Sequence, residues 1–328
     1  MTIAIWGAGS VGLTLGARLA RAGENVLFVC RSAEAAAQID RAGVRFEDLG
    51  SGERWRARAA ARAVADVDAT ALAGAPILLC VRSPQTACAL LELSRVAERD
   101  SIVACVQNGI GGDALVAQRF ATAIGVVYRQ TCTRAAANAV ASAGAGRLIV
   151  GLHPRGDRPA VHDLAERLRG AGYDVGISQS IDADRWLKLC VNLMSAPNAL
   201  IRRDQHRRPE FVEIKARLLE EARLALRAAG ITARSCDGRD RSLDEEIEFQ
   251  RGALARGESA RPLSLYNQVW SSLRHGGPCE ADEYHERILE LAERHDIEAR
   301  MNARVLAALR RAVRDALGPE CIDADELL

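Results

Sequence analysis

The side chain best suited to chemistry in this sequence is a lysine with apolar neighbours. Lys188 lies between Trp186, Leu187 and Leu189 in the segment WLKLCVN, and an ammonium buried there is costly without a partner. The apolar spacing predicts a helix, which puts Asn192 on the same face as Lys188, four residues further on. Such an ammonium can stabilise negative charge on an oxygen and donate a proton to it. A lysine that only reaches solvent from a helix surface has the same spacing, so both interpretations stay open.

Near the N-terminus, three glycines mark a place where a ligand can approach the backbone. GAGSVG, at residues 7–12, fits G-x-G-x-x-G directly after a strand-like run and at the start of a helical pattern. The first glycine permits a tight turn, the second lets backbone approach a pyrophosphate, and the third lets helix and strand pack closely. The helix N-terminus offers unpaired N–H groups to the phosphates. This context predicts a dinucleotide site rather than a glycine-rich turn without a ligand. Its predicted contacts are Gly7, Gly9, Ser10 and Gly12.

The end of the second strand indicates which dinucleotide is bound. NAD-binding proteins of this kind place Asp or Glu there, to bond the ribose 2′-hydroxyl. This chain has Cys30, Arg31 and Ser32 instead. A guanidinium suits a 2′-phosphate, so we predict NADP(H) with Arg31 as a cofactor contact. The alternative is that Arg31 only faces solvent at a strand end.

Two further strand ends carry polar residues. VRSPQT, at residues 81–86, and VQNGIG, at residues 106–111, each follow a buried strand segment. Ligands of doubly wound sheets lie beyond the carboxyl ends of the strands. Asn108 can therefore bond nicotinamide, ribose or a catalytic group, although an ordinary Asn-Gly turn has the same sequence.

These residues need a scaffold, and the apolar pattern predicts one of class α/β. Strand-like runs alternate with helical patterns through the first half, which indicates a parallel sheet covered on both faces. The predicted strands are residues 2–7, 25–30, 76–81 and 101–106, with weaker candidates at 123–128 and 147–150. After about residue 181 only helical spacing remains. We therefore predict a Rossmann-type doubly wound domain at residues 1–180, which binds NADP, and an all-helical substrate and catalytic domain at residues 181–328. Residues 232–261 are polar and predicted to form a loop with a solvated helix.

Composition excludes several other classes of protein. The 328 residues are 48% hydrophobic, and 44 basic side chains nearly balance 43 acidic ones. A net charge of +1 argues against general binding of nucleic acid or anionic membranes. Nine cysteines without a C-x-x-C pair, and histidines without metal-ligand spacing, predict neither a disulfide framework nor a metal site. No apolar run is long enough to span a membrane, and no signal peptide is evident, so we expect a cytoplasmic protein.

Taken together, these stretches resemble the ketopantoate reductase family. The matching elements are GAGSVG, VRSPQT, the QNG turn, the K-x-x-x-N helix and CEADEYHERILELAERHDI near the C-terminus. The resemblance implies an NADPH-dependent reductase of a 2-oxo acid, by default of ketopantoate to pantoate in pantothenate biosynthesis. It makes Lys188 the catalytic general acid and Glu280 its conserved acidic partner. It also implies cofactor contacts at Arg82, Gln85 and Asn108, and substrate contacts at Asn108 and Asn192.

The sequence departs from the family pattern on the substrate side. Ala196 stands where a second Asn is common, so Asn198 is predicted to take that role from a shifted position. Gln268 stands where the family usually has Ser, and we predict that Gln268 binds substrate; Ser264 or Ser271 are alternatives. The cofactor motifs are intact, so the reaction type is better defined than the substrate.

Two other functions stay open. One is a related oxidoreductase that acts on another oxo or imino acid, of the β-hydroxyacid or opine type. The other is a non-catalytic NADPH-binding sensor. The C-terminal amphipathic helices support either a homodimer or burial of their apolar faces within their own domain.

Overall fold

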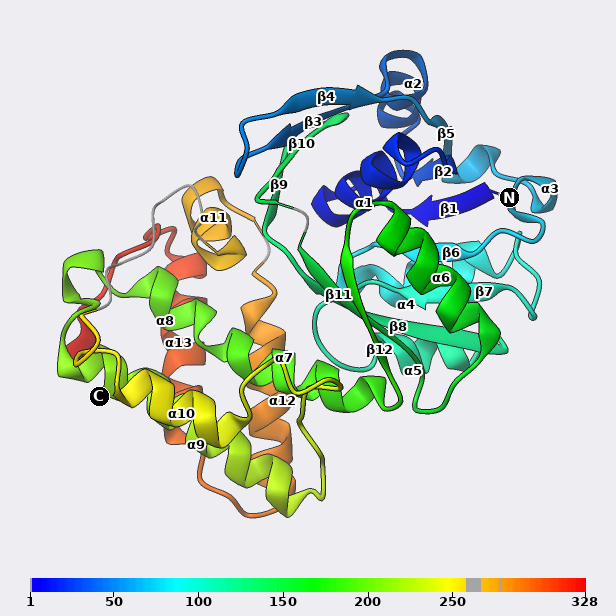
Figure 1. Cartoon of the computed structure of the whole chain (residues 1–328). Coiled ribbons are helices and arrows are strands. Elements are labelled where there is room, and N and C mark those ends of the chain that lie inside the picture. Colours follow the sequence, from blue (N-terminus) through cyan, green and yellow to red (C-terminus); the bar gives the residue numbers. More distant parts are fainter. Residues whose placement is uncertain (1, 145, 258–266, 278) are drawn as a thin grey trace. The chain divides into compact units, whose positions relative to one another are not determined.

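The computed structural model describes residues 2–144, 146–257, 267–277 and 279–328. The chain divides into two compact units, Met1–Asp182 and Ala183–Leu328 (Figure 1). Each unit is described by itself below.

The first unit alternates strands with helices, as predicted. Its elements in chain order are β1 (Thr2–Trp6), α1 (Ser10–Arg21), β2 (Asn25–Cys30), α2 (Ala33–Ala42), β3 (Val44–Asp48), β4 (Arg54–Ala57), β5 (Ala60–Ala63), η1 (Val64–Asp66), α3 (Ala69–Leu72), β6 (Ile77–Leu79), η2 (Ser83–Gln85), α4 (Thr86–Leu93), β7 (Ile102–Cys105), α5 (Gly112–Ala117), β8 (Thr122–Arg129), β9 (Cys132–Ala136), β10 (Ala139–Ser142), β11 (Arg147–Leu152), α6 (Pro159–Gly170) and β12 (Asp174–Ser178).

The main sheet has the strand order of a doubly wound nucleotide-binding fold. Its described strands lie in the order β12-β11-β8-β7-β6-β1-β2-β5. The pairs β5–β2, β2–β1, β1–β6, β6–β7 and β7–β8 are parallel, and β11 runs antiparallel to β8. The predicted α/β class is confirmed. Because the parallel strands end at one edge, the turns after β1, β2, β6 and β7 lie along that edge.

The central strand is buried on both faces, which explains its unbroken apolar sequence. Ile3 and Ile5 of β1 belong to a core that includes apolar residues of α1 and α6. Ala4 and Trp6 point to the other core, which includes residues of α4. Alternate side chains of a strand face opposite sides, so both sets must be apolar here.

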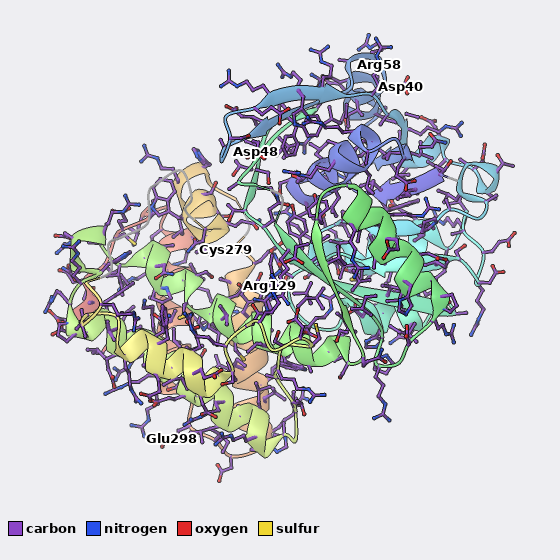
Figure 2. All side chains as sticks on the ribbon, in the orientation of Figure 1. Asp40, Asp48, Arg58, Arg129, Cys279 and Glu298 are labelled. Carbon is purple, nitrogen blue, oxygen red and sulfur yellow. The ribbon has the colours of Figure 1, made fainter. Side chains whose placement is uncertain are left out.

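A second sheet, in the order β4-β3-β10-β9, was not predicted. Its strands are short, and their charged side chains, as in VRFED and RWRA, hide the alternating pattern. Arg18 ties this sheet to α1: its guanidinium contacts a carboxylate oxygen of Asp48 at 3.2 Å and the carbonyl oxygen of Gly144 at 2.7 Å. It also lies 5.0 Å from the ring centre of Phe46. Asp48 is labelled in Figure 2.

The described part of the second unit is built of helices, in agreement with the sequence. They are α7 (Ile181–Leu193, which begins two residues before the division), α8 (Ser195–Leu200), η3 (Arg203–Gln205), α9 (Pro209–Ala228), α10 (Leu243–Arg251), α11 (Gln268–His275), α12 (Ala281–Arg294), α13 (Arg300–Arg314) and η5 (Ala324–Glu326). Among the described residues, no helix is long and apolar enough to cross a membrane.

The polar segment 232–261 contains α10, which is less solvated than predicted. Ser242 and Glu245 form a capping box at its start. Leu243 and Ile247 are buried on the face that packs against α9. Residues 258–266 lie outside the described part of the chain, and Ser264 is among them.

Candidate functional site

The glycine turn between β1 and α1 allows a close approach of backbone. Gly7 has φ +107°, and its N–H donates to the carbonyl oxygen of Val29 at 3.0 Å. A Cβ on Gly12 would lie 2.0 Å from the Gly7 oxygen, so a side chain does not fit there. A Cβ on Gly9 would meet only the Cys80 carbonyl oxygen, at 4.0 Å. The space beside Gly9 is therefore open to a ligand.

The N-terminus of α1 favours a negatively charged ligand. Its first backbone bond runs from the N–H of Leu13 to the oxygen of Gly9, so the preceding N–H groups lack a partner within the helix. The first turn carries no acidic residue. The Ser10 carbonyl is occupied by the hydroxyl of Thr14 at 2.8 Å. Free N–H groups and the positive end of the helix dipole suit a pyrophosphate.

Arg31 stands exposed directly after β2. The next residue, Ser32, is the N-cap of α2, and its hydroxyl oxygen accepts the N–H of Ala35 at 3.3 Å. Burial raises the pKa of Cys30 to about 11, so its thiol stays protonated at neutral pH. Arg31 is thus the charged side chain that this strand end presents.

A buried glutamine joins the turns after β6 and β7. The Gln107 amide donates to the Val81 carbonyl and to the Thr86 hydroxyl, both at 2.8 Å. The Ser83 hydroxyl donates to the Asn108 carbonyl at 3.0 Å. These bonds place Asn108 beside the turn that carries Arg82 and Gln85. The sequence analysis missed the role of Gln107, although its place at the end of an apolar run was a usable signal.

In the second unit, α7 carries Lys188 and Asn192 one turn apart, as predicted. Lys188 is partly exposed, and its neighbours Leu187 and Leu189 are buried. Trp186 is 9% exposed and Cys190 is fully buried, so α7 holds this lysine between two apolar turns. The part of α7 that carries Lys188 is therefore well packed against the rest of the second unit.

Glu280 precedes α12 and caps no backbone N–H with its side chain. Its carboxylate accepts the phenol O–H of Tyr284 at 3.4 Å, one helical turn away. Burial, followed by the charges of Glu280 and Glu283, raises the pKa of Tyr284 well above its usual value. A protonated phenol is therefore available to hold the carboxylate.

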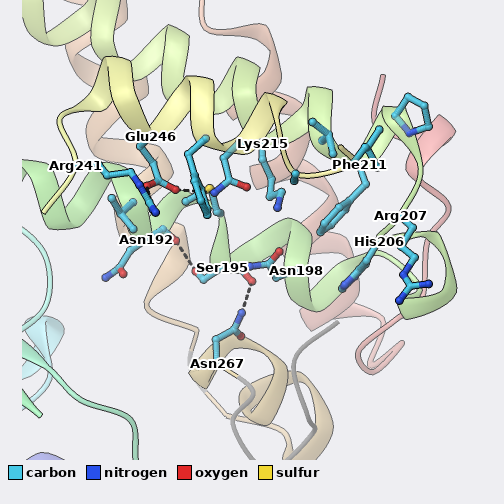
Figure 3. Close-up of a pocket in the computed structure, with 18 of the residues that line it drawn as sticks. Asn192, Ser195, Asn198, His206, Arg207, Phe211, Lys215, Arg241, Glu246 and Asn267 are labelled. Atoms are coloured by element: carbon cyan, nitrogen blue, oxygen red, sulfur yellow. Dashed lines mark hydrogen bonds and ion pairs between the residues drawn. The ribbon is translucent and has the colours of Figure 1, made fainter. Parts of the chain in front are cut away.

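Asn192 and Asn198 line one cavity of about 820 Å³ in the second unit (Figure 3). Among the described residues, neither side-chain amide has a hydrogen-bond partner. Ser195 lies between them, and its carbonyl accepts the amide of Asn267 at 2.8 Å. Gln268 is exposed at the start of α11 and does not line this cavity, whereas its neighbour Asn267 does.

Ala196, one of the positions where the sequence departs from the family pattern, is buried, and so is His285 of α12. Ala196 is fully buried, so its methyl group belongs to the packing of α8. His285 is fully buried on α12, with its Nδ1 2.9 Å from the side-chain oxygen of Asn302. Burial lowers the pKa of His285 to about 4, so it is neutral at physiological pH. A neutral His285 provides packing and one hydrogen bond rather than charge.

One group of side chains in the first unit has donor types that suit a metal ion. Ligand atoms of Asp113, His153 and Asp182 all lie within 4.8 Å of one another. His153 Nδ1 is 3.0 Å from the Asp182 carboxylate. This contact joins the residue after β11 to the first turn of α7. The three residues are far apart in sequence, so no local spacing could have indicated the group.

The strand order, the glycine turn and the open space beside Gly9 define a dinucleotide-binding protein of the Rossmann class. Two family models match the chain: Ketopantoate reductase PanE/ApbA at residues 3–155, and Ketopantoate reductase PanE/ApbA C terminal at residues 180–313. The chain therefore belongs to the ketopantoate reductase PanE/ApbA family of oxidoreductases, which confirms the resemblance seen in the sequence.

Individual relatives agree over nearly the whole chain. A 2-dehydropantoate 2-reductase from Pyrococcus abyssi is 26% identical over 304 residues, which cover 92% of this chain and 94% of the relative. A PanE/ApbA family ketopantoate reductase structure from Ralstonia eutropha JMP134 gives a TM-score of 0.78 at 22% identity, over 96% of this chain and 99% of that one. D-mandelate dehydrogenase with NADH and anilino(oxo)acetate gives 0.79 at 18% identity, over 97% and 100%. These two structures share the fold.

Proposed function

We propose that this chain uses NADPH to reduce a 2-oxo acid to a 2-hydroxy acid, with Lys188 as the proton donor. The default substrate is 2-dehydropantoate, which gives pantoate. The observation that carries the proposal is the pair Lys188 and Asn192 on one face of α7, with Asn192 in the wall of the 820 Å³ cavity. Only two of the 44 basic residues of this chain are lysines, so a lysine rather than an arginine at position 188 is unusual for its composition.

The choice of NADPH is supported by the residues around the glycine turn. Gly9 leaves room for a pyrophosphate, and the first turn of α1 has no acid to repel it. Arg31 stands where an NAD-specific chain places an acidic residue, and its guanidinium suits a 2′-phosphate. Arg82, Gln85 and Asn108 complete the proposed cofactor contacts. When bound, the reduced nicotinamide supplies a hydride to the substrate's carbonyl carbon.

The protein's own part in this chemistry is electrostatic and acid–base. Negative charge develops on the carbonyl oxygen, and an ammonium beside it stabilises that charge. We assign this role to Lys188, whose Nζ then donates the proton that completes the alcohol. Glu280 is proposed to hold that ammonium or to accept a bond from a substrate hydroxyl, with its carboxylate fixed by Tyr284.

Amides are proposed to orient the substrate. The side-chain amides of Asn192 and Asn198 have no partner among the described residues, so each can bond a ligand in the cavity without breaking an existing bond. Gln268 stays a predicted contact, although Asn267 is the residue that lines the cavity. No disulfide joins any of the nine cysteines in the described part of the chain, and we propose a reducing compartment such as the cytoplasm.

The direct test is turnover by the purified protein. NADPH oxidation is followed with 2-dehydropantoate and with a panel of 2-oxo acids, each with and without added amine. Reduction of a 2-oxo acid without amine supports the proposal, and a requirement for amine points to the opine-type alternative. NADPH binding without turnover of any oxo acid contradicts the proposal and favours a sensor.

A further inference from the structure

The two amides proposed to bind substrate belong to different helices. The helix α7 ends at Leu193 and α8 begins at Ser195. Asn192 and Asn198 therefore lie on either side of the junction. Pro197 explains why the chain does not continue as one regular helix, because proline has no N–H for the carbonyl of Leu193, four residues before it, and its ring crowds that carbonyl. The spacing of the two amides thus depends on how α8 is held by its neighbours.

Asn267 holds the start of α8. Its amide donates to the Ser195 carbonyl at 2.8 Å (Figure 3), and its side-chain oxygen accepts the backbone N–H of Trp270 at 2.9 Å. The Ser195 hydroxyl in turn donates to the carbonyl of Asn192 at 2.6 Å. One half-buried side chain, the N-cap of α11, thus connects the first turn of that helix to the junction of α7 and α8.

Glu320 holds the opposite end of α8. Its backbone N–H donates to the carbonyl of Ala199 at 2.8 Å. Its carboxylate accepts the indole N–H of Trp270 at 3.1 Å. Trp270 therefore contacts Asn267 through its backbone and Glu320 through its ring. Both ends of α8 are fixed by hydrogen bonds that lead to this one residue of α11.

The backbone of Glu320 supports this interpretation. Its φ is +58°, in the left-handed region that few residues other than glycine adopt. The other two described non-glycine residues with positive φ, Asp296 and Ala316, follow the ends of α12 and α13, where a left-handed residue commonly ends a helix. Glu320 does not follow a helix. A conformation of this kind persists where the surrounding bonds hold it, and here those bonds are the ones to Ala199 and Trp270.

We propose that Asn267 is a positioning residue for substrate binding, which fixes α8 so that the amide of Asn198 faces the same substrate as the amide of Asn192. The inference rests on the proposed function, because it takes these two amides as substrate contacts. The family pattern has its second amide at position 196, where this chain has the buried Ala196. Asn198 lies two positions further on, about 200° around a helix, so it replaces that amide only if α8 is held in one orientation.

Asn267→Asp and Asn267→Ser separate positioning from helix capping. Both side chains still accept the N–H of Trp270, but a carboxylate cannot donate to the Ser195 carbonyl and a serine is too short to reach it. In both variants we expect KM for 2-dehydropantoate, measured at saturating NADPH, to rise by about tenfold, with a smaller change in kcat. KM for NADPH should not change. An unchanged KM for 2-dehydropantoate in both variants overturns the inference, even if Tm falls.

A double-mutant cycle shows whether Asn267 acts through Asn198. Asn198→Ala should itself raise KM for 2-dehydropantoate. The addition of Asn267→Asp should then have little further effect, because the amide that α8 positions has already been removed. Independent effects would multiply the two increases in KM, and that result would overturn the inference.

Glu320 allows a second test of the same bonds. Glu320→Gly removes the carboxylate without straining the backbone, because glycine adopts φ +58° freely. We expect this variant to raise KM for 2-dehydropantoate by about threefold, the value of one neutral hydrogen bond. Glu320→Gln keeps an acceptor for the Trp270 indole, so it should retain most of the affinity.

Asn25→Asp is the matched control. Asn25 is exposed at the start of β2 in the first unit, and its amide donates to the Thr2 hydroxyl at 2.8 Å. The substitution makes the same change of charge and removes the same kind of donor outside the second unit, so KM for 2-dehydropantoate should not change. A rise equal to that of Asn267→Asp would overturn the assignment to Asn267.

A binding measurement separates failure of the inference from failure of the proposed function. Pantoate, the product of the proposed reaction, is added with NADP⁺, and the rise in Tm reports binding without turnover. If 2-dehydropantoate is reduced and the Asn267 variants keep its KM, the reaction stands and the positioning role is wrong. If no 2-oxo acid is reduced, but pantoate raises Tm and Asn267→Asp abolishes this rise, the positioning role stands and the reaction is wrong. Neither turnover nor binding of pantoate would overturn both.

Discussion

A Cβ on Gly12 would lie 2.0 Å from the carbonyl oxygen of Gly7. Real Cβ atoms do not approach backbone oxygens this closely, so Gly12→Ala must displace α1 from β1. We expect the first unit to lose about 3 kcal/mol of stability, the upper part of the range for overpacking. Differential scanning calorimetry should show a fall in Tm of roughly 5–10 °C. An unchanged Tm would show that the turn is less tightly packed than described.

Gly9→Ala is the matched substitution with the opposite expectation. Its Cβ would meet only the Cys80 oxygen at 4.0 Å, so folding and Tm should be close to those of the unmodified protein. The methyl group would instead occupy the space proposed for the pyrophosphate, and the Kd for NADPH should rise by about tenfold or more. Fluorescence titration measures this change. Retained affinity would place the phosphates elsewhere.

Arg31→Asp tests the choice of cofactor. The unmodified protein should prefer NADPH, because the exposed guanidinium after β2 can bond a 2′-phosphate. The carboxylate of the variant would repel that phosphate and accept the 2′-hydroxyl of NADH. We expect the ratio of kcat/KM for NADPH to that for NADH to fall by about 100-fold. Equal use of both cofactors by the unmodified protein would contradict the assignment.

Lys188→Ala tests the proposed proton donor. Loss of a general acid typically lowers kcat by roughly 10²–10⁴-fold. NADPH binding should persist, because the proposed cofactor contacts belong to other elements. Lys188→Arg keeps the charge but donates its proton poorly, so it should restore substrate affinity more than kcat. Full turnover by Lys188→Ala would rule out the mechanism.

Glu280→Gln tests whether the carboxylate of Glu280 acts in catalysis or only stabilises the fold. The glutamine keeps the shape and can still accept the Tyr284 hydroxyl, but it removes the charge. If Glu280 holds the ammonium of Lys188, kcat/KM should fall by about tenfold or more with little change in Tm. A fall in Tm without a change in kcat/KM would limit Glu280 to a role at the start of α12. Tyr284→Phe should show a smaller change of the same kind.

Stability should fall with pH between about 6.5 and 4 because of His285. Its pKa is about 4 in the folded protein and near 6.5 when unfolded, so in this range only the unfolded chain binds the proton. The associated stabilisation, about 3 kcal/mol, is complete above pH 6.5 and is lost as pH falls towards 4. Urea unfolding at several pH values should show a shallower decline for His285→Gln.

His206 contributes to the same decline, since its pKa is also lowered, so the variant removes only part of it. Substitution of the exposed His295 serves as the control for loss of a histidine at the surface. An unaltered pH dependence in His285→Gln would show that this imidazole is not buried as a neutral group.

The sequence was most informative where a local pattern has a single structural solution. The glycines at residues 7–12 and the unbroken apolar run of β1 predict a strand, a tight turn and a helix, and the structure contains them. The face shared by Lys188 and Asn192 follows from helical spacing alone. Element bounds differ by a few residues, as with the strand predicted at 76–81, which is observed as Ile77–Leu79.

Features made by distant segments could not be predicted in this way. The second sheet pairs β3 with β10 from the other end of the first unit, and neither strand has a strong pattern of its own. The cavity has the same origin, because Lys215 of α9, Phe249 of α10 and Asn267 before α11 are distant in sequence and line one cavity only through packing. Gln268 and Asn267 differ by one position at a helix start, where only the cap geometry decides which side chain lines the cavity.

The pairing of β3 with β10 also determines when the second sheet can form during synthesis. The glycine turn and α1 are translated before β10, so the sheet that contacts Arg18 of α1 is incomplete until residues 139–142 have emerged. A nascent chain that ends earlier has the proposed phosphate-binding turn without the second sheet beside α1. The second sheet beside the proposed cofactor turn is therefore completed only after most of the first unit has been translated.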